Sequence, residues 1–564
     1  MSSRQESIVD DSVCQGIKET AVTLTGKELT IENVVEIARY GYPVELTDDA
    51  LVYKKMKDSC DFVKNAVSAG RPLYGVNTLF GGMAHSYVLA KHESTCELQN
   101  NLLYFLKTGT GAYLPSEDVR AAMLLRANSH LIGASGIRME IVSRLLTYIN
   151  KQITPLVPEF GSIGASGDLI PLAYIGGSIC GTNETFLVDY RGKTINAVQA
   201  LEHAKLEKIS LLPKEGLAMT NGTSVMTASA TIAIHDSLIL FAATLRMHAM
   251  AMQAMLSDVQ PFYPFIHQLK PHAGQQLVAR TMLDLLSGSK MINDCSIEIH
   301  PNVLIQNRYS VRCIPQYLGP FIEAIHDIRR IVEIEINSAN DNPLIDGENQ
   351  KAYVGGNFLG EHISTSMDRL RYTIGLISKH IDVQIAQVVM PEFSNGLPGC
   401  LIGNREREAN MGVKGLQLCG NSIMPYLLFL GNSIADKYAT HAEQYNQNIN
   451  SLGQMSALLA RRSTMILQQH IAVGFLIFVQ GLDLRSKLIQ NTYDPRKLLS
   501  TPILKTYDAI RELIQVPILN EKPYIWNDNE QSLDKHIQLV ADNITNKHSS
   551  LYQSLQPTIE SLKN

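Results

Sequence analysis

The chain has 564 residues, of which 45% are hydrophobic and only 18% are charged, with 49 basic against 54 acidic side chains. Soluble proteins usually carry about 25% charged residues. The apolar composition excludes a disordered chain, and the absence of a basic excess argues against a nucleic-acid-binding protein. A low charge content is expected where much of the surface is buried, in a large core, an oligomer or a membrane.

The cysteines and the N-terminal segment indicate a reducing compartment. The eight cysteines include no Cys-x-x-Cys pair, which argues against a zinc site and favours reduced, structural thiols. The first residues, MSSRQESIVDDSVC, are polar and lack the apolar core of a signal peptide. We therefore expect a cytoplasmic protein without a bound metal.

One segment has the length and composition of a membrane-spanning helix. Ser463 to Leu482 is 20 residues long without a formal charge, which is long enough to cross a bilayer. Gln468, Gln469 and His470 lie near its middle, and a helix buried on all sides in a large core has the same composition. We interpret this segment as a buried core helix and expect no membrane association.

The distribution of patterns along the chain predicts a mainly α protein. Residues 1–25 resemble a flexible tail, residues 26–210 mix short apolar runs with glycines, and residues 211–490 show long helical periodicity. Residues 491–564 predict a C-terminal helical region, in which 531–562 is typical of one amphipathic helix. The long helices are expected at 223–258, 317–338, 365–390 and 453–489. Helices that are apolar around most of their circumference need neighbours on all sides, so we expect a long central bundle and self-association.

The glycine-rich segment Gly161–Leu172, GSIGASGDLIPL, is the strongest candidate for chemistry. A serine-nucleophile elbow is excluded because Asp168 replaces its last glycine. The segment could simply cap a helix, with Asp168 near the N-cap. Alternatively, the Gly167 nitrogen, which has no Cβ beside it, could approach the Ala165 carbonyl carbon closely. Ring closure there with loss of the Ser166 hydroxyl would give 4-methylidene-imidazol-5-one (MIO), an electrophile built from backbone.

Six further blocks accompany this segment along the chain. They are Leu73–Thr78, Lys214–Ser224, Gln306–Cys313, Asn340–Asp346, Gly356–Phe358 and Glu443–Gln447. With these blocks the chain resembles the aromatic amino acid ammonia-lyase family, which includes histidine, phenylalanine and tyrosine lyases and related aminomutases, from about residue 30 to the end. It is most similar to the bacterial, cyanobacterial-type phenylalanine lyases. The resemblance implies a fumarase/aspartase-like helical architecture whose N-terminal domain carries the MIO loop.

The implied reaction removes ammonia from an L-aryl amino acid and leaves a trans-arylacrylate. The resemblance assigns the electrophile to Ala165, Ser166 and Gly167, and the abstraction of the β-proton to Tyr74. Taken alone, a tyrosine before glycine is more often a packing residue. Because an unperturbed tyrosine has a pKa near 10, we expect helix N-termini or cationic neighbours to assist Tyr74.

The resemblance also implies the substrate-binding residues. Arg312 would bind the carboxylate, since a guanidinium meets a carboxylate with two parallel hydrogen bonds. Tyr309, three residues earlier, would share its helical face and act as a second site tyrosine. Glu443 is expected near the substrate amine. The remaining implied binding residues are Asn221, Gln306, Asn342, Phe358, Lys414, Asn446 and Gln447.

The side chains that face the aromatic ring should decide the substrate. The resemblance places Phe105, Leu106 and Leu217 at these positions, where tyrosine-selective relatives have a histidine and histidine lyases a Ser-His pair. An unpaired buried phenol costs about 1–3 kcal/mol. We therefore expect conversion of L-phenylalanine to trans-cinnamate, in L-phenylalanine catabolism or phenylpropanoid metabolism.

Two departures from the family pattern keep alternatives open. Leu79 stands where relatives usually have glycine, and its Cβ is expected to restrict φ and stiffen the loop that carries Tyr74. Asn77 resembles the loops of histidine lyases and aminomutases. The alternatives are an aminomutase giving β-phenylalanine, a lyase preferring tyrosine, histidine or a substituted phenylalanine, and a catalytically inactive helical scaffold. The resemblance further implies a homotetramer with shared active sites and no external cofactor.

Overall fold

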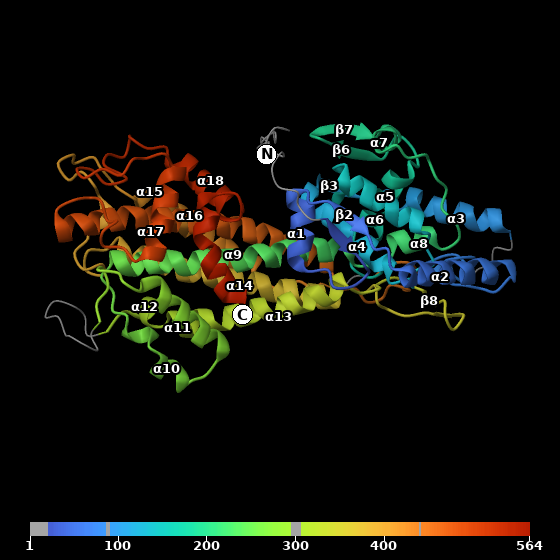
Figure 1. Ribbon diagram of the computed structural model, residues 1–564, viewed down its shortest axis with the longest axis horizontal. Coiled ribbons are helices and arrows are strands. Elements are labelled where there is room, and N and C mark those ends of the chain that lie inside the picture. The colour runs from blue at the N-terminus through green and yellow to red at the C-terminus, as the bar shows by residue number, and fades with distance from the viewer. Residues whose placement is uncertain (1–20, 86–90, 295–305, 439–440, 564) are drawn as a thin grey trace. The chain divides into compact units, whose positions relative to one another are not determined.

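The computed structural model describes residues 21–85, 91–294, 306–438 and 441–563. Helices dominate this part of the chain, and its strands have only three or four residues (Figure 1). The chain forms two compact units, each built from separate segments. Unit 1 comprises residues 1–232, 329–367 and 433–458, and unit 2 comprises residues 233–328, 368–432 and 459–564. The mainly α class predicted from the sequence is confirmed, whereas the predicted contiguous domains stay a prediction.

Unit 1 contains short helices and small sheets. Strands β1 (Val22–Leu24) and β2 (Val44–Leu46) pair in parallel, and three antiparallel groups follow: β3 (Thr110–Tyr113) with β5 (Pro158–Phe160), β4 (Ile153–Pro155) with β6 (Leu187–Tyr190) and β7 (Lys193–Asn196), and β8 (Leu344–Asp346) with β9 (Lys351–Tyr353). The helices lying wholly in this unit are α1 (Ile31–Tyr40), α2 (Ala50–Ser68), α3 (His92–Phe105), α4 (Ser116–Leu131), α5 (Met139–Asn150), α6 (Leu169–Cys180), α7 (Ala197–Ala204) and α8 (Glu215–Thr220), with the 3₁₀ turn η1 (Gly81–Met83).

Four long helices appear where the sequence periodicity predicts them. They are α9 (Ser224–Ala254), α13 (Ile314–Ile336), α14 (Glu361–Val388) and α16 (Gly453–Gln490). Among the described residues, α9 and α16 are long and apolar enough to span a membrane by length and composition. Their most apolar windows are 94% and 83% buried inside the protein. This burial is what the core-helix interpretation of Ser463–Leu482 expects.

Unit 2 adds shorter helices to its parts of the long ones. They are α10 (Pro264–Gln268), α11 (Ala273–Leu286), α12 (Tyr309–Arg312), α15 (Lys414–Leu430), α17 (Thr501–Leu513), α18 (Leu533–Ile544) and α19 (Ser550–Lys563), with the 3₁₀ turns η2 (Gln260–Phe262) and η3 (Gly399–Leu401). The single amphipathic helix expected over 531–562 is wrong, because the chain turns between α18 and α19. In that turn Asn546 accepts from the His548 N–H, and the Ser549 hydroxyl oxygen accepts from the Tyr552 N–H at 2.9 Å.

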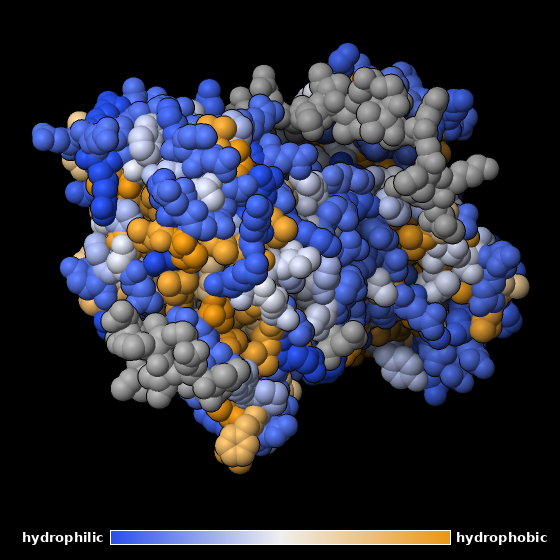
Figure 2. All heavy atoms as spheres, turned by 60° about the vertical axis from the view of Figure 1, so that its left-hand side comes forward, coloured by the Kyte–Doolittle hydropathy of each residue, from blue (hydrophilic) through white to orange (hydrophobic). Residues whose placement is uncertain are grey.

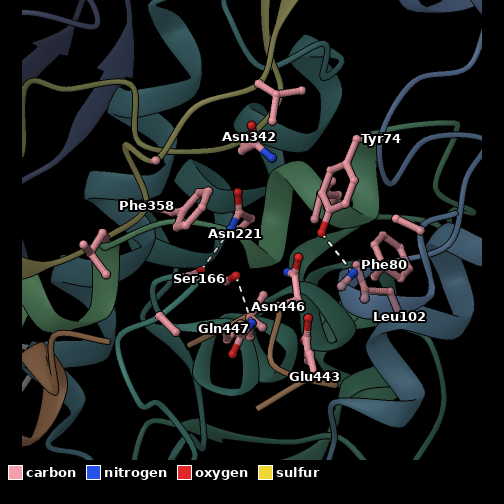
Figure 3. Close-up of a pocket in the computed structure, with 18 of the residues that line it drawn as sticks. Tyr74, Phe80, Leu102, Ser166, Asn221, Asn342, Phe358, Glu443, Asn446 and Gln447 are labelled. Carbon is pink, nitrogen blue, oxygen red and sulfur yellow. Dashed lines mark hydrogen bonds between the residues drawn. The ribbon is translucent and has the colours of Figure 1, made fainter. Parts of the chain in front are cut away.

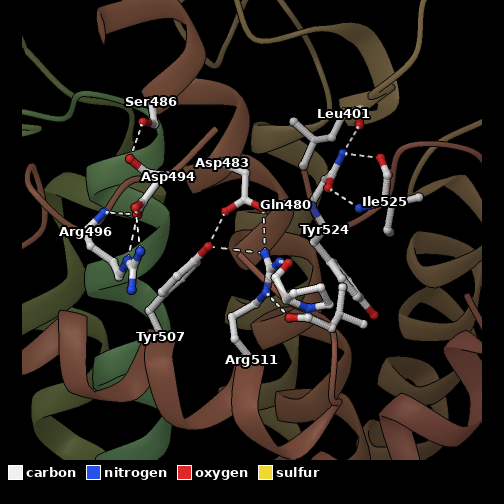
Figure 4. A network of polar contacts seen from close by, with 12 residues as sticks. Leu401, Gln480, Asp483, Ser486, Asp494, Arg496, Tyr507, Arg511, Tyr524 and Ile525 are labelled. Atoms are coloured by element: carbon white, nitrogen blue, oxygen red, sulfur yellow. Dashed lines mark hydrogen bonds and ion pairs between the residues drawn. The ribbon is translucent and has the colours of Figure 1, made fainter. Parts of the chain in front are cut away.

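A buried carboxylate joins three parts of unit 2. Asp483 on α16 accepts hydrogen bonds from the Tyr507 hydroxyl at 2.6 Å, from Arg511 Nη1 at 2.7 Å and from the Tyr524 N–H at 2.7 Å (Figure 4). Tyr507 and Arg511 lie on α17, and Tyr524 follows it. Removing one partner of such a buried pair typically costs 3–5 kcal/mol. The network therefore fixes α17 and the following segment to α16.

Histidines buried among these helices are held neutral. His470 Nδ1 lies 2.8 Å from the Ser378 hydroxyl, and His380 Nδ1 lies 2.9 Å from His248 Nε2. Burial lowers the pKa of His470 to about 3 and that of His380 to about 4. Neither histidine of the folded protein therefore takes up a proton near neutral pH.

We expect the free energy of unfolding to fall as the pH decreases below about 6.5, the pKa of histidine in the unfolded chain. Down to the folded-state values, the unfolded chain binds more protons, and each buried histidine costs roughly 1.4 kcal/mol per pH unit. His470→Gln should lower this slope by the contribution of one histidine, whereas Gln469→Ala, which removes no titrating group from the exposed neighbouring position, should leave it unchanged. Urea unfolding between about pH 7 and about pH 5 measures the slope; an equal slope in all three proteins would contradict the prediction.

Candidate active site

A pocket of about 630 Å³ in unit 1 collects most of the residues predicted from the sequence (Figure 3). Its walls come from all three chain segments of the unit. The predicted residues that line it are Tyr74, Phe105, Leu106, Ala165, Ser166, Leu217, Asn221, Asn342, Phe358, Glu443, Asn446 and Gln447. Amide, carboxyl and hydroxyl side chains thus face the cavity among apolar residues, which is the usual composition of a site for a small organic ligand.

The glycine-rich loop is anchored by Asp168. Asp168 occupies the N-cap position of α6, as the helix-capping interpretation proposes, but its side chain makes no capping hydrogen bond to that helix. Instead, Oδ2 accepts from the N–H groups of Val225 and Met226 at the start of α9, both at 2.9 Å, and Oδ1 accepts from the Ser162 hydroxyl at 3.0 Å. Burial raises the pKa of Asp168 to about 7, while these donors lower it.

The three residues of the proposed ring meet its steric requirements. Gly167 has φ +69°, and a Cβ on it would lie 2.0 Å from the Gly222 carbonyl oxygen, so only glycine fits. Ser166 is held at both ends, because Asn221 Nδ2 donates to its carbonyl and Gln447 Nε2 donates to its hydroxyl, both at 3.0 Å. Ala165 is buried and adds only a methyl group. The residues present therefore fit an MIO group.

The loop that carries Tyr74 is closed by its own side chains. Asn77 accepts from the Leu73 N–H at 2.7 Å and donates to the Arg71 carbonyl at 3.0 Å, while the Thr78 hydroxyl oxygen accepts from the Gly75 N–H at 2.9 Å. Leu79 does not adopt a positive φ, so its Cβ causes no backbone strain. The stiffening expected from Leu79 stays a prediction, and the structure assigns the internal bracing to Asn77 and Thr78.

The Tyr74 hydroxyl points into the pocket and accepts a hydrogen bond from the Gly81 N–H at 3.0 Å (Figure 3). Burial raises the pKa of Tyr74, the nearby Glu443 raises it further, and the Gly81 N–H lowers it. Burial also raises the pKa of Glu443. Within the described chain, a cation is not among the groups that shift the Tyr74 pKa. The expected cation is thus missing from these groups, whereas the backbone donor, Gly81, is the first residue of the 3₁₀ turn η1.

Four predicted residues belong to unit 2 and do not line this pocket: Gln306, Tyr309, Arg312 and Lys414. Three of them form a cluster, which we call the arginine cluster. Arg312 Nη1 donates to Gln306 Oε1 at 2.6 Å, and the guanidinium lies 4.6 Å from the centre of the Tyr309 ring. The shared helical face predicted for Tyr309 and Arg312 is confirmed. Tyr309 is 73% exposed, and Lys414 is exposed at the start of α15.

The pocket also contains residues that the sequence did not single out. Phe80 and Phe105 face each other with ring centres 6.3 Å apart and form an aromatic wall. His85 follows the Tyr74 loop and adds a polar ring to the lining. A single phenylalanine or histidine outside a motif carries no recognisable sequence signal, so only their proximity in sequence to Tyr74 could have suggested Phe80 and His85. The other additions are Gly81, Ala84, Val354, Gly355, Leu359 and Ile449, whereas Leu102, Leu169 and Gly356, which also line the pocket, belong to segments with a family match.

Comparison with known proteins gives the family. Residues 29–512 match the family described as aromatic amino acid lyase. The chain belongs to this family. It is 50% identical to a phenylalanine ammonia-lyase of Nostoc punctiforme over 97% of this chain and 96% of that protein. It is 31% identical to a phenylalanine aminomutase of Talaromyces islandicus over 87% of this chain and 71% of that protein.

Solved structures agree with the family. The phenylalanine aminomutase of Pantoea agglomerans superimposes with a TM-score of 0.84 at 28% identity, over 94% of this chain and 100% of that one. The family resemblance predicted from the MIO motif and its companion blocks is thereby confirmed, as is the helical fold.

We expect Gly81→Ala to abolish most ammonia release, because the new Cβ would lie 2.1 Å from Glu443 Oε2 and displace the carboxyl group. Gly70→Ala is the matched control. Gly70 has a similar left-handed φ, +67° against +56°, but no atom lies within 4 Å of the position that its new Cβ would take. Both changes should cost roughly 1–2 kcal/mol of stability from backbone strain. Assays of ammonia release and thermal unfolding test this; equal activity in both variants would disprove the steric argument.

Proposed function

We propose that the protein is a cytoplasmic phenylalanine ammonia-lyase that converts L-phenylalanine to trans-cinnamate and ammonia. The observation that carries the proposal is the arrangement around Ser166: a loop that fits an MIO group faces a pocket with an aromatic wall, and Tyr74 and Glu443 point into the same space. The similarity to the Nostoc phenylalanine ammonia-lyase supports the choice of substrate.

Ala165, Ser166 and Gly167 would hold the MIO group. Once formed, it supplies an electrophilic carbon that activates the amino group of the substrate for departure. Asn221 and Gln447, which bind Ser166 in the structure, would keep the loop oriented toward the pocket. Gly167 and Gly222 bring the loop into direct backbone contact with the segment behind it.

Tyr74 would remove the proton from the substrate β-carbon. To act as a base it must first lose its own proton, and the Gly81 N–H stabilises the oxygen that results. An ionised Glu443 opposes this step, since its negative charge raises the pKa of Tyr74. The raised pKa of Glu443 itself favours its neutral form, in which it can accept or donate a hydrogen bond beside the substrate amine.

The ring of the substrate would pack against Phe80, Phe105, Leu106 and Leu217. Phe105 and Leu106 offer no hydrogen-bond partner to a phenol, which favours phenylalanine over tyrosine. His85 is the one lining side chain of the described pocket with a ring nitrogen, and it makes a substituted phenylalanine the second candidate substrate.

An aminomutase that forms β-phenylalanine is the alternative reaction. The bracing of the Tyr74 loop by Asn77 favours it, because a loop that opens slowly retains the product long enough for ammonia to add back. The higher identity to a lyase than to an aminomutase, 50% against 31%, favours the lyase.

Incubation with L-phenylalanine should give trans-cinnamate as the main product, measured by ultraviolet absorbance and chromatography. L-Tyrosine should react roughly ten- to a hundredfold more slowly, the factor that corresponds to an unpaired buried phenol. Ser166→Ala should remove the activity while leaving the fold intact. β-Phenylalanine as the main product would establish the aminomutase instead, and unchanged cinnamate formation by Ser166→Ala would refute the electrophile.

We further propose a homotetramer in which another copy supplies the arginine cluster. The pocket lining includes no lysine or arginine within the described residues, although the substrate carries a carboxylate. Apolar side chains gather on one face of the molecule (Figure 2), and large exposed apolar patches commonly mark interaction surfaces. The exposed apolar residues on α14 and α15 include Tyr372, Leu418, Tyr426 and Phe429.

Co-expression of two inactive variants tests the shared site. Ser166→Ala and Arg312→Ala should each be inactive, and mixed oligomers should regain part of the activity, because some sites then combine an intact loop with an intact arginine. Ser166→Ala with Tyr74→Phe is the control, and this pair should show no recovery, since both residues line the same pocket of one chain. Absence of recovery in the first pair would show that each chain uses its own Arg312.

A further inference from the structure

Arg126 on α4 is a charged residue in the interior of unit 1. Its side chain is 0% exposed, Nη1 donates to the Asn221 carbonyl at 2.9 Å, and Nη2 donates to the Ser129 hydroxyl at 3.1 Å. Burial lowers its pKa to about 10, while Asp341 and Asp168 raise it, so the guanidinium remains charged at neutral pH. Burying a charge costs several kcal/mol unless it is well paired, and Arg126 does not line the pocket.

The guanidinium lies directly behind the Asn221–Gly222 segment. A Cβ on Gly222 would lie 2.1 Å from Arg126 Nη1 and 2.5 Å from Asn340 Oδ1, so the backbone is pressed against both side chains. Asn340 Nδ2 in turn donates to the Thr223 hydroxyl at 2.8 Å. Arg126 and Asn340 therefore prevent the Asn221–Gly222 segment from moving toward α4.

On the side opposite Arg126, the Asn221–Gly222 segment contacts the glycine-rich loop. Gly222 and Gly167 form a parallel β-bridge, and the Asp168 N–H donates to the Gly222 carbonyl at 2.7 Å. Asn221 Nδ2 donates to the Ser166 carbonyl. The residue whose carbonyl Arg126 binds thus also binds the central residue of the proposed ring.

We propose that Arg126 is a positioning residue for formation of the MIO group: it fixes the Asn221–Gly222 segment from behind, and the segment holds Ala165, Ser166 and Gly167 in the conformation from which the ring closes. This inference rests on the proposed function. It assigns to a residue outside the pocket a role in making the electrophile, separate from any contact with the substrate.

Formation of the MIO ring needs no added reagent, because it consists of one bond formation and the loss of two water molecules. The Gly167 nitrogen bonds to the Ala165 carbonyl carbon, and the carbonyl oxygen leaves as water with the hydrogens of the Gly167 and Ser166 nitrogens. Ser166 then loses its hydroxyl and its α-hydrogen as a second water. No atom is oxidised or reduced by an external partner, so the positions of backbone atoms limit the reaction.

The mass of the peptide that spans Ala165–Gly167 tests the proposal independently of activity. Each protein is isolated as folded oligomer by size-exclusion chromatography and digested, and the fraction of the peptide that lacks two water molecules is measured. We expect full modification in the wild-type chain. In Arg126→Met the modified fraction should be about one tenth of the wild-type fraction or smaller, because the loss of one hydrogen bond to a charged group corresponds to about a tenfold effect. Arg246→Met is the matched control, because Arg246 in unit 2 is also buried and binds Thr506, Thr558 and the Pro502 carbonyl.

Arg126→Lys covers the case in which Arg126→Met does not fold. Lysine keeps the positive charge and can donate a hydrogen bond, but it lacks the planar guanidinium with its several donors. In samples taken at intervals after expression is stopped, the Arg126→Lys peptide should therefore lose its two water molecules about tenfold more slowly than the wild-type peptide. Full modification of a folded Arg126→Met, or wild-type maturation of Arg126→Lys, would overturn the positioning role. An equal loss in Arg246→Met would overturn it as well. A wild-type peptide of unmodified mass would instead refute the proposed function, which separates the two failures.

Discussion

The contact between the backbones of Gly167 and Gly222 is the constraint on which the candidate site depends. A Cβ on Gly167 would lie 2.0 Å from the Gly222 carbonyl oxygen, so two chain segments meet there without any side chain between them. The contact determines which way Ser166 faces, and it places Asp168 where its carboxylate can bind the first turn of α9. Asn221, next to Gly222, then reaches Ser166, and the pocket is assembled around these few atoms.

The long buried helices contribute to the low charge content of the chain. Several of their buried hydroxyl groups form hydrogen bonds within the helix: Thr231, Ser237 and Thr244 each donate to the carbonyl four residues earlier. Some buried charges form ion pairs, as Lys214 does with Asp341 at 2.8 Å and Asp483 with Arg511, whereas Arg246 binds two hydroxyl groups and a carbonyl. A chain can therefore hold helices long enough to cross a bilayer inside a protein core, provided that each polar group finds a partner.

The parts of the site that chemistry fixes could be predicted from the sequence. A ring made from backbone requires one small residue, one dehydratable residue and one glycine in order, so Ala165, Ser166 and Gly167 could be proposed from the sequence, beside the alternative that the segment caps a helix. The long helices could be read from their periodicity. Partners that come from distant segments could not: the sequence does not reveal that Asp168 caps α9 and not α6, or that the Gly81 N–H meets the Tyr74 hydroxyl. The prediction of one helix across the turn between α18 and α19 overlooks the polar run at residues 545–550, in which Asn546 and Ser549 supply the hydrogen bonds that interrupt the helix.

The discontinuous make-up of unit 1 sets an order of events during synthesis. Gln447, which binds the Ser166 hydroxyl, belongs to the last of the three segments of that unit, residues 433–458. Chains emerge from the ribosome N-terminus first. Most of the protein is therefore translated before Gln447 is available to bind Ser166. The surroundings of Ser166 are therefore complete only in a chain whose residues 433–458 have joined the earlier segments of unit 1, and a chain truncated before them would lack the donor to the Ser166 hydroxyl.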